Sequence, residues 1–368
     1  MSGRFYRLPP EYRKMQISSV PMPTSRTIQR CSFEMYRVNR YAGTLPGHRS
    51  VAAFTRTKYR IARKSMNNKL RTALLGMPYL GPRLRQWLAA AEELERLKPG
   101  DFYSPIASDE TIEAYARFDV CGTRVINLGE TRLSAVEIDT NAQCELLQQF
   151  ERDGLLATDW MKRYADNEFF HRMDAAILHA MISHHKPKRI IEIGSGFSTL
   201  AILDSLEANK LDNTELTLIE PFPERLLNNI SSPDLRRFKL LQRPLEAADI
   251  SDICQLQYDD LLLVDSSHVY KIGSDVQLLF ESIYPALEQG VLLHIHDVFF
   301  PFDYPASWLR RGHHYNEAYV LRTFLQFNRS FEILLWNNLM RHLSGRPFPA
   351  CLRPPENQIA CSIWLRRC

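Results

Sequence analysis

Two carboxylates in the C-terminal half of the chain each close an apolar run. Asp265 follows the run LLLV, and Asp297 follows LLHIH. If these runs are neighbouring parallel strands, their carboxyl ends lie about 4.8 Å apart, at the edge where open α/β sheets bind ligands. His268 stands three residues after the first carboxylate, and His296 directly precedes the second. Oxygen-rich groups suit Mg²⁺ or Mn²⁺, so we predict a divalent metal site at Asp265, Asp297 and His296.

The same residues could also move a proton. An imidazole titrates near neutral pH, so His268 can accept a proton from a hydroxyl nucleophile. We therefore predict that His268, Asp265 and Asp297 form a catalytic centre. The alternative is that both acids cap helices and that the neighbouring histidines belong to the core. For His294, which lies within its apolar run rather than at its end, we expect a core position with satisfied hydrogen bonds.

A glycine-rich turn, IIEIGSGFST (190–199), forms the second group. Gly194 and Gly196 allow a sharp turn and let a ligand approach the backbone closely. Position 199 is Thr where the dinucleotide fingerprint has its third Gly, which argues against a pyrophosphate clamp. Glu220 closes the next apolar run, where a carboxylate can accept both ribose hydroxyls of an adenosine. The alternative for Glu220 is a solvated acid that caps the following helix.

Strands and helices must position these residues, and from about residue 161 the two alternate. We predict seven strands, at 188–193, 215–220, 238–243, 260–265, 291–297, 331–336 and 361–366. We predict helices at 198–209, 224–230, 274–287 and 317–327. Near-continuous apolar strands separated by helices indicate a parallel sheet covered on both faces. The Pro-rich stretch before the last strand leaves no room for a crossover helix, so that strand should be antiparallel.

The charge of the chain is distributed unevenly. Residues 1–80 carry 16 Lys and Arg against only Glu11 and Glu34. A basic arm of this kind suggests an anionic partner, which could be nucleic acid, anionic lipid or the acidic remainder of the chain itself. We predict three zones: this arm at 1–80, a mainly helical extension at 81–160 and an α/β domain at 161–368. Within the extension we expect helices from Pro82 and over 141–152, and a short helix capped by Ser108.

Cysteine usage and hydropathy indicate a reducing, aqueous environment. The seven cysteines are scattered and include no C-x-x-C pair, which predicts neither a disulfide framework nor a zinc site. No apolar run approaches the roughly 20 residues needed to cross a bilayer. The first residues lack the apolar stretch of a secretory signal. We therefore expect a cytoplasmic protein.

The segment from about 160 onwards resembles the class I S-adenosylmethionine-dependent methyltransferases, particularly the methyltransferase-24 group. The matching stretches are RYADNEFFHRMDA, PKRIIEIGSGFSTL, LTLIEPFPERLL, VDSSHVYKIGSDV, HIHDVFFPFDYP and NEAYVLRTFLQFN. The resemblance implies a Rossmann-like α/β fold and S-adenosylmethionine as cofactor. It also implies that the turn containing Glu192, Gly194, Ser195 and Gly196 holds the methionine part. Glu220 would bind the ribose, and Asp265 would complete the cofactor site.

A second resemblance concerns the metal and the acceptor. Metal-dependent catechol-type and macrolide-sugar O-methyltransferases have an Asp at the end of the fourth strand, acids at the end of the fifth, and a base three residues after the first Asp. Asp265, His268 and the pair His296–Asp297 are similar, although His296 stands where the sugar enzymes have an acid. This implies O-methylation of a sugar, glycolipid or other small molecule.

Two segments are expected to face the acceptor. The extension at 81–160, together with Tyr164, Asn167 and Phe170, would roof the substrate side. The aromatic segment 298–315 would form a lid, or would simply pack against the body. Two other functions stay open: a nucleic-acid methyltransferase that uses the basic arm, with steeply salt-dependent RNA binding, and a non-catalytic scaffold that binds the cofactor.

Overall fold

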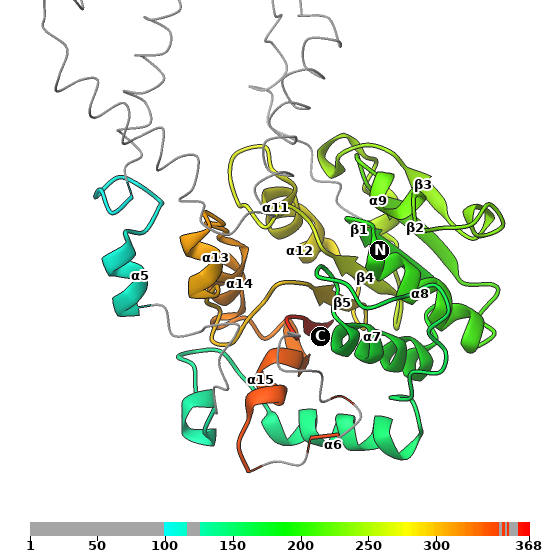
Figure 1. The fold of residues 1–368 in the computed structure, drawn as a ribbon, viewed down its shortest axis with the longest axis horizontal. Coiled ribbons are helices and arrows are strands. Elements are labelled where there is room, and N and C mark those ends of the chain that lie inside the picture. Colours follow the sequence, from blue (N-terminus) through cyan, green and yellow to red (C-terminus); the bar gives the residue numbers. More distant parts are fainter. Residues whose placement is uncertain (1–98, 116–125, 346–347, 350–351, 353–359) are drawn as a thin grey trace, which may run out of the picture. The chain divides into compact units, whose positions relative to one another are not determined.

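The computed structural model describes residues 99–115, 126–345, 348–349, 352 and 360–368 (Figure 1). The chain divides into two compact units, Met1–Ala91 and Glu92–Cys368, and all the described residues belong to the second. The predicted basic arm and the predicted helix from Pro82 therefore lie outside the described residues.

One sheet of seven strands organises this unit, in the order β3-β2-β1-β4-β5-β7-β6. The strands are β1 (Arg189–Ile193), β2 (Glu215–Ile219), β3 (Lys239–Leu241), β4 (Leu261–Val264), β5 (Leu292–Ile295), β6 (Phe331–Trp336) and β7 (Ile363–Arg367). Strands β1 to β5 pair in parallel, whereas β7 is antiparallel to both β5 and β6. The predicted sheet, mostly parallel with an antiparallel last strand, is confirmed.

The register of the central strands places the two groups of candidate residues at one edge. Ile193 of β1 pairs with Val264 of β4, which in turn pairs with Ile295 of β5. All residues of β4 and β5 are buried, as expected for parallel strands covered on both faces. The residues that follow these three strands therefore leave the sheet at the same level.

Helices connect the strands and cover the sheet (Figure 1). They are α5 (Asp109–Tyr115), α6 (Thr140–Arg152), α7 (Arg172–His185), α8 (Phe197–Ala208), α9 (Glu224–Leu227), α10 (Ser251–Cys254), α11 (Asp275–Leu278), α12 (Tyr284–Ala286), α13 (Ala306–Arg310), α14 (Glu317–Leu325) and α15 (Asn337–His342). A π-helical segment, Leu279–Ile283, joins α11 to α12, so the helix predicted over 274–287 is continuous but not uniform. The short helix α5 begins as predicted, because Ser108 Oγ accepts a hydrogen bond from the Thr111 amide.

Helix α7 was not predicted, and its burial explains why. Every residue from Met173 to Ser183 is buried, so the helix has no polar face. Periodicity cannot reveal a helix that is covered all round. Helix α7 packs beside α8 (Figure 1), and it brings Asp174 of its first turn into the core.

The first part of the aromatic segment 298–315 packs into the body, whereas residues 310–313 are exposed. The side chains of Phe299, Phe300, Phe302 and Tyr304 are each at most 1% exposed. None of the helices in the described part of the chain has the length and apolarity needed to cross a lipid bilayer.

Candidate active site

The turn after β1 is shaped by the approach of its own chain. Gly194 has a φ of +80°, and a Cβ at this position would lie 1.8 Å from the carbonyl oxygen of Asp265. Only glycine combines this backbone conformation with so close an approach. The backbone after β4 occupies the space that a Cβ would need, which is a reason for glycine at this position besides the predicted approach of a ligand.

Glu192 stabilises the same turn through hydrogen bonds in the protein interior. Its fully buried carboxylate accepts hydrogen bonds from Ser198 Oγ and Thr199 Oγ1, both at 2.5 Å. Burial raises the pKa of this carboxyl to about 8, although the two hydroxyls oppose the shift. Thr199 Oγ1 also accepts a hydrogen bond from the Gly196 backbone amide at 3.1 Å. Thr199, at the position where the dinucleotide fingerprint has glycine, thus ties the turn to the first turn of α8.

Glu220 links the turn after β1 to the one after β2. Its carboxylate accepts the Ser195 amide at 3.0 Å and the Phe222 amide at 2.7 Å. The structure thereby brings together Ser195 and Glu220, two residues predicted to bind the cofactor. A carboxylate has about four lone-pair sites, so both bonds leave acceptor capacity on Glu220.

An aromatic wall that the sequence analysis did not single out stands beside this turn. The Phe169 ring is stacked on Phe197 at 6.0 Å between centroids, and the guanidinium carbon of Arg225 lies 4.0 Å from the Phe169 ring centroid. Phe169 is 54% exposed. Its neighbours in the predicted roof are packed inward instead: the Tyr164 hydroxyl and the Asn167 amide both donate to the Phe170 carbonyl.

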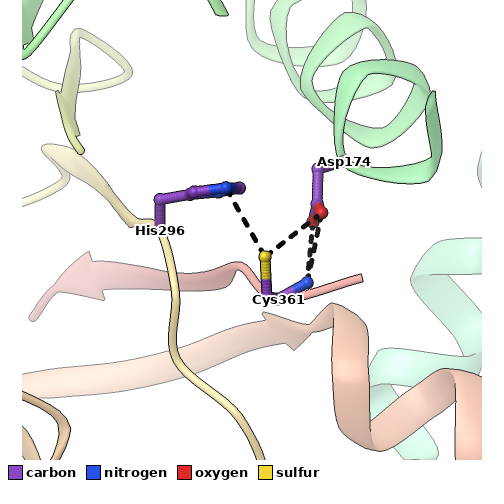
Figure 2. Close-up of side chains that lie close together, drawn as sticks. All are labelled: Asp174, His296 and Cys361. Carbon is purple, nitrogen blue, oxygen red and sulfur yellow. Dashed lines mark hydrogen bonds between the residues drawn. The ribbon is translucent and has the colours of Figure 1, made fainter. Parts of the chain in front are cut away.

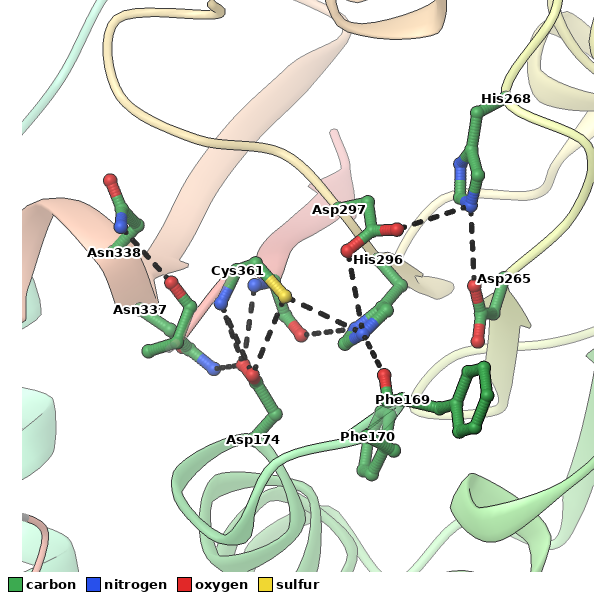
Figure 3. A network of polar contacts seen from close by, with 12 residues as sticks. Phe169, Phe170, Asp174, Asp265, His268, His296, Asp297, Asn337, Asn338 and Cys361 are labelled. Carbon is green, nitrogen blue, oxygen red and sulfur yellow. Dashed lines mark hydrogen bonds and ion pairs between the residues drawn. The ribbon is translucent and has the colours of Figure 1, made fainter. Parts of the chain in front are cut away.

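The predicted catalytic residues come together at the ends of β4 and β5. His268 Nε2 lies 3.4 Å from Asp265 Oδ1 and 3.4 Å from Asp297 Oδ2. Figure 3 shows both carboxylates directed at this nitrogen. The imidazole itself is 6% exposed, whereas both carboxylates are partly open to solvent.

Glu317, which the sequence analysis quoted only within a longer motif, completes the group. Its Oε2 lies 2.9 Å from His268 Nδ1, and the side chain is buried at the start of α14. The Asn316 and Glu317 amides both donate to the His268 carbonyl oxygen. The Asn316 side chain accepts from and donates to the backbone of Tyr270. An acid in the first turn of an amphipathic helix was the available signal, but it is also an ordinary helix-capping signal.

The charges of this group determine its protonation. Burial alone would lower the pKa of His268, but its hydrogen bonds to the carboxylates of Asp265 and Glu317 and the charge of Asp297 outweigh it, and the pKa lies well above the ordinary value. Burial alone would raise the pKa of Asp265, but His296 and His268 lower it to about 2. The surrounding carboxylates therefore favour the protonated form of His268, and only the neutral form of the imidazole can accept a proton.

Two of these residues have an uncommon backbone conformation. The φ values of His268 and Asp297 are +59° and +57°, in the left-handed region that residues other than glycine rarely adopt. Such conformations cost about 1–3 kcal/mol and persist only where the surroundings enforce them. Here they turn both side chains out of the strand direction and towards each other.

His296 contacts Asp297, with 3.7 Å between its Nε2 and Asp297 Oδ1, and it also faces a second group of side chains. His296 Nε2 is 3.1 Å from the Phe169 carbonyl and 3.5 Å from Cys361 Sγ. The atoms that can share an ion with Asp265 and Asp297 are those of His268, so His268 takes the place that we predicted for His296. His294 is fully buried, as predicted. Within the described part of the chain neither of its ring nitrogens has a hydrogen-bond partner, so the expectation of satisfied hydrogen bonds was wrong.

Part of the chain matches known proteins in sequence. Residues 191–298 match a family model described as a methyltransferase domain. An uncharacterized protein from Archaeoglobus fulgidus is 38% identical over 88 residues, a stretch that covers 24% of this chain and 39% of that protein. The chain therefore spans well under half the length of this relative.

Solved structures of methyltransferases are also similar. The S-adenosylhomocysteine-bound methyltransferase PaMTH1 of Podospora anserina is 17% identical, with a TM-score of 0.35 and coverage of 64% of this chain and 90% of that one. The structure named cmcI-D160 Mg-SAM is 16% identical, with a TM-score of 0.33 and coverage of 53% and 71%. The stretch that matches the methyltransferase domain model, residues 191–298, contains strands β2 to β5 and most of β1.

Proposed function

We propose that this domain transfers the methyl group of S-adenosylmethionine to a hydroxyl of a sugar, glycolipid or other small molecule. The observation that carries the proposal is the position of His268. Its Nδ1 is held by Glu317, and its Nε2 faces Asp265 and Asp297. Asp265 faces this nitrogen with its carboxylate, and its carbonyl oxygen lies against Gly194, which supports a site shared with the cofactor.

The cofactor would lie across the ends of β1 and β2. Glu220 keeps acceptor capacity for ribose hydroxyls, and the Ser195 amide fixes its orientation. The turn from Gly194 to Gly196 would face the methionine part. Phe169 and Arg225 provide an exposed cation–π pair at the rim, where they can exclude water from one side of the cofactor.

The reaction asks little of the protein, because the sulfonium methyl group is already activated. The hydroxyl oxygen attacks the methyl carbon, the carbon–sulfur bond breaks, and the hydroxyl proton passes to His268 Nε2. Alignment of the two reactants and removal of this proton are the remaining requirements. Glu317 stabilises the charge that develops on the imidazole, since it bonds the opposite nitrogen.

The donor set also fits a divalent cation. Asp265, His268 and Asp297 each offer one atom within 4.8 Å of the others, and carboxylate oxygens are the ligands that Mg²⁺ and Mn²⁺ prefer. Asp265 and Asp297 would hold the ion, because His268 cannot both coordinate and accept the proton. A bound cation would lower the pKa of the acceptor hydroxyl as a Lewis acid.

A methyl-transfer screen tests the proposal. The full chain is incubated with S-adenosylmethionine carrying a labelled methyl group, and with separate pools of sugars, glycolipids, phenols and RNA. We expect label in a hydroxyl-bearing small molecule, and loss of that label with His268→Ala. Transfer to RNA would overturn the acceptor class, and cofactor binding without transfer to any pool would favour a scaffold.

A further inference from the structure

A second group of metal-binding side chains lies behind the candidate active site. Asp174 comes from the first turn of α7, His296 from the end of β5, and Cys361 from the segment that enters β7 (Figure 2). One atom of each lies within 4.8 Å of the other two. All three residues are at most 2% exposed, and the mechanism proposed above uses none of them.

We propose that Asp174, His296 and Cys361 bind a zinc ion. Thiolate, imidazole and carboxylate are the three ligand types that zinc takes in proteins, whereas magnesium and calcium avoid sulfur. The proposal is independent of the methyl-transfer reaction. It also differs from the Asp265–His268–Asp297 site in its chemistry, because that site offers no sulfur.

The distances fit a tetrahedral site. Cys361 Sγ lies 3.5 Å from His296 Nε2 and 3.7 Å from Asp174 Oδ2. With zinc–sulfur bonds of about 2.3 Å and zinc–nitrogen or zinc–oxygen bonds of about 2.0 Å, neighbouring ligand atoms of a tetrahedron lie about 3.5 Å apart. The Cys361 thiol therefore already lies at this spacing from both partners, and the ligand atoms of Asp174 and His296 lie within 4.8 Å of each other.

The surroundings orient these side chains as the partners of zinc ligands usually do. Ser362 Oγ lies 3.1 Å from His296 Nδ1, so a bond there leaves Nε2 available to a metal. Asp174 Oδ1 accepts hydrogen bonds from the side-chain amide of Asn337 at 2.7 Å and from the backbone amide of Ser362 at 3.2 Å. The other carboxylate oxygen, Oδ2, faces Cys361. Such outer bonds fix the tautomer and direction of metal ligands. In the structure the Phe169 carbonyl oxygen lies 3.1 Å from His296 Nε2 and accepts a hydrogen bond from its N–H.

The ion would join segments that are far apart in the chain. Asp174 belongs to α7, His296 directly follows β5, and Cys361 lies just before β7 (Figure 3). His296 is also the neighbour of Asp297, and its Nε2 lies 3.7 Å from Asp297 Oδ1. Zinc at this place would therefore hold the end of β5, from which Asp297 reaches the candidate active site.

Cobalt spectroscopy tests the proposal, because cobalt(II) bound to a thiolate shows an intense sulfur-to-metal charge-transfer band. The metal-free full chain is titrated with Co²⁺ as wild type and as Cys361→Ser, Cys144→Ser and Asp265→Asn. Cys144 is also a buried cysteine but lies in α6, and Asp265→Asn disables the other site. We expect the band with one equivalent in wild type, Cys144→Ser and Asp265→Asn, its loss in Cys361→Ser, and its displacement by Zn²⁺ but not by Mg²⁺.

No band in the wild type, or a band that persists in Cys361→Ser, would overturn the proposal. A second measurement needs no variant, in case Cys361→Ser does not fold. X-ray absorption at the zinc edge of the zinc-loaded wild-type chain should show one sulfur at about 2.3 Å and nitrogen or oxygen ligands at about 2.0 Å. A shell without sulfur, or with several sulfurs, would contradict the assignment.

Discussion

The two halves of the candidate active site are built on different principles. At the ends of β1 and β2, Glu192 and Glu220 accept hydrogen bonds from their own chain, and Gly194 closes against the backbone of Asp265. At the ends of β4 and β5, Asp265, His268 and Asp297 face one another on a strained backbone. The first half is defined by the conformation of two turns, and the second by charged side chains that contact one another.

This difference teaches what substitutions should do in each half. Substitutions in the turns after β1 and β2 should first change the stability of the fold, and should change ligand binding only through the altered shape of the turn. Substitutions in the charged group after β4 and β5 should change the protonation of the neighbouring side chains and the rate of the reaction, because these side chains contact one another. The predictions below separate these two kinds of effect.

Gly194→Val should have the largest effect, and that effect should be on folding. A Cβ would lie 1.8 Å from the Asp265 carbonyl, on a backbone with φ of +80°, so we expect a loss on the order of 4–5 kcal/mol of stability. Chemical denaturation measures it. Gly273→Ala is the matched control, since it has φ of +70° but no atom within 4 Å of the added Cβ, and it should lose only about 1 kcal/mol. Equal losses would show that strain, not close approach, selects glycine at 194.

His268→Ala should remove the proton acceptor, and the domain should still fold although it loses stability because the buried Glu317 loses its partner. We expect the rate of methyl transfer to fall by about 10²–10⁴-fold, with the affinity for S-adenosylhomocysteine unchanged. Single-turnover kinetics with the acceptor found in the screen measure the rate. His184→Ala, at an exposed position near the end of α7, should behave as wild type. A His268→Ala enzyme with wild-type rate would remove His268 from the mechanism.

Glu192 should make the stability of the domain depend on pH. Its carboxyl has a pKa of about 8 in the folded protein and about 4.3 in an unfolded chain. The folded state binds the extra proton between these values, so this contribution is complete below about pH 4 and is lost as the pH rises through 8. We expect wild type to lose on the order of a few kcal/mol between pH 5 and pH 9 relative to Glu192→Gln. Parallel denaturation curves at both pH values would contradict the buried, protonated carboxyl.

Glu317→Gln should shift the pH profile of the reaction more than its maximum. The rate requires neutral His268, so its rising limb should lie above the ordinary histidine range, because neighbouring carboxylates raise the pKa of His268. Removal of one carboxylate lowers that pKa, and we expect the limb to move to lower pH by about one unit. Glutamine keeps an acceptor for Nδ1. A limb that stays in place, with a general loss of rate, would make Glu317 only a packing residue.

The sheet could be predicted from the sequence because buried parallel strands are recognisable as continuous apolar runs. The runs LLLV and LLHI are buried at every position, and a carboxylate that closes such a run must lie at the sheet edge. The positions of Asp265 and Asp297 followed directly. Helix α7 gave no such signal, since it is buried on all sides.

The side on which each histidine lies was harder to predict. His294 and His296 are two residues apart, so a regular strand directs them to the same face, and their rings are stacked at 6.0 Å. Strand alternation could therefore have placed His296 on the same face as the buried His294. The left-handed turns at His268 and Asp297, and the contact with Glu317 from 49 residues away, depend on tertiary structure that no local pattern contains.

Binding of S-adenosylhomocysteine by isothermal titration calorimetry tests the central claim most directly, because it separates the two halves of the site. We expect the wild-type full chain to bind with micromolar affinity, an order of magnitude usual for a small-molecule pocket. Glu220→Ala should weaken binding by about 1–3 kcal/mol with little change in melting temperature, and His268→Ala should bind as wild type does. No binding by the wild type, or equal weakening by both variants, would contradict the account.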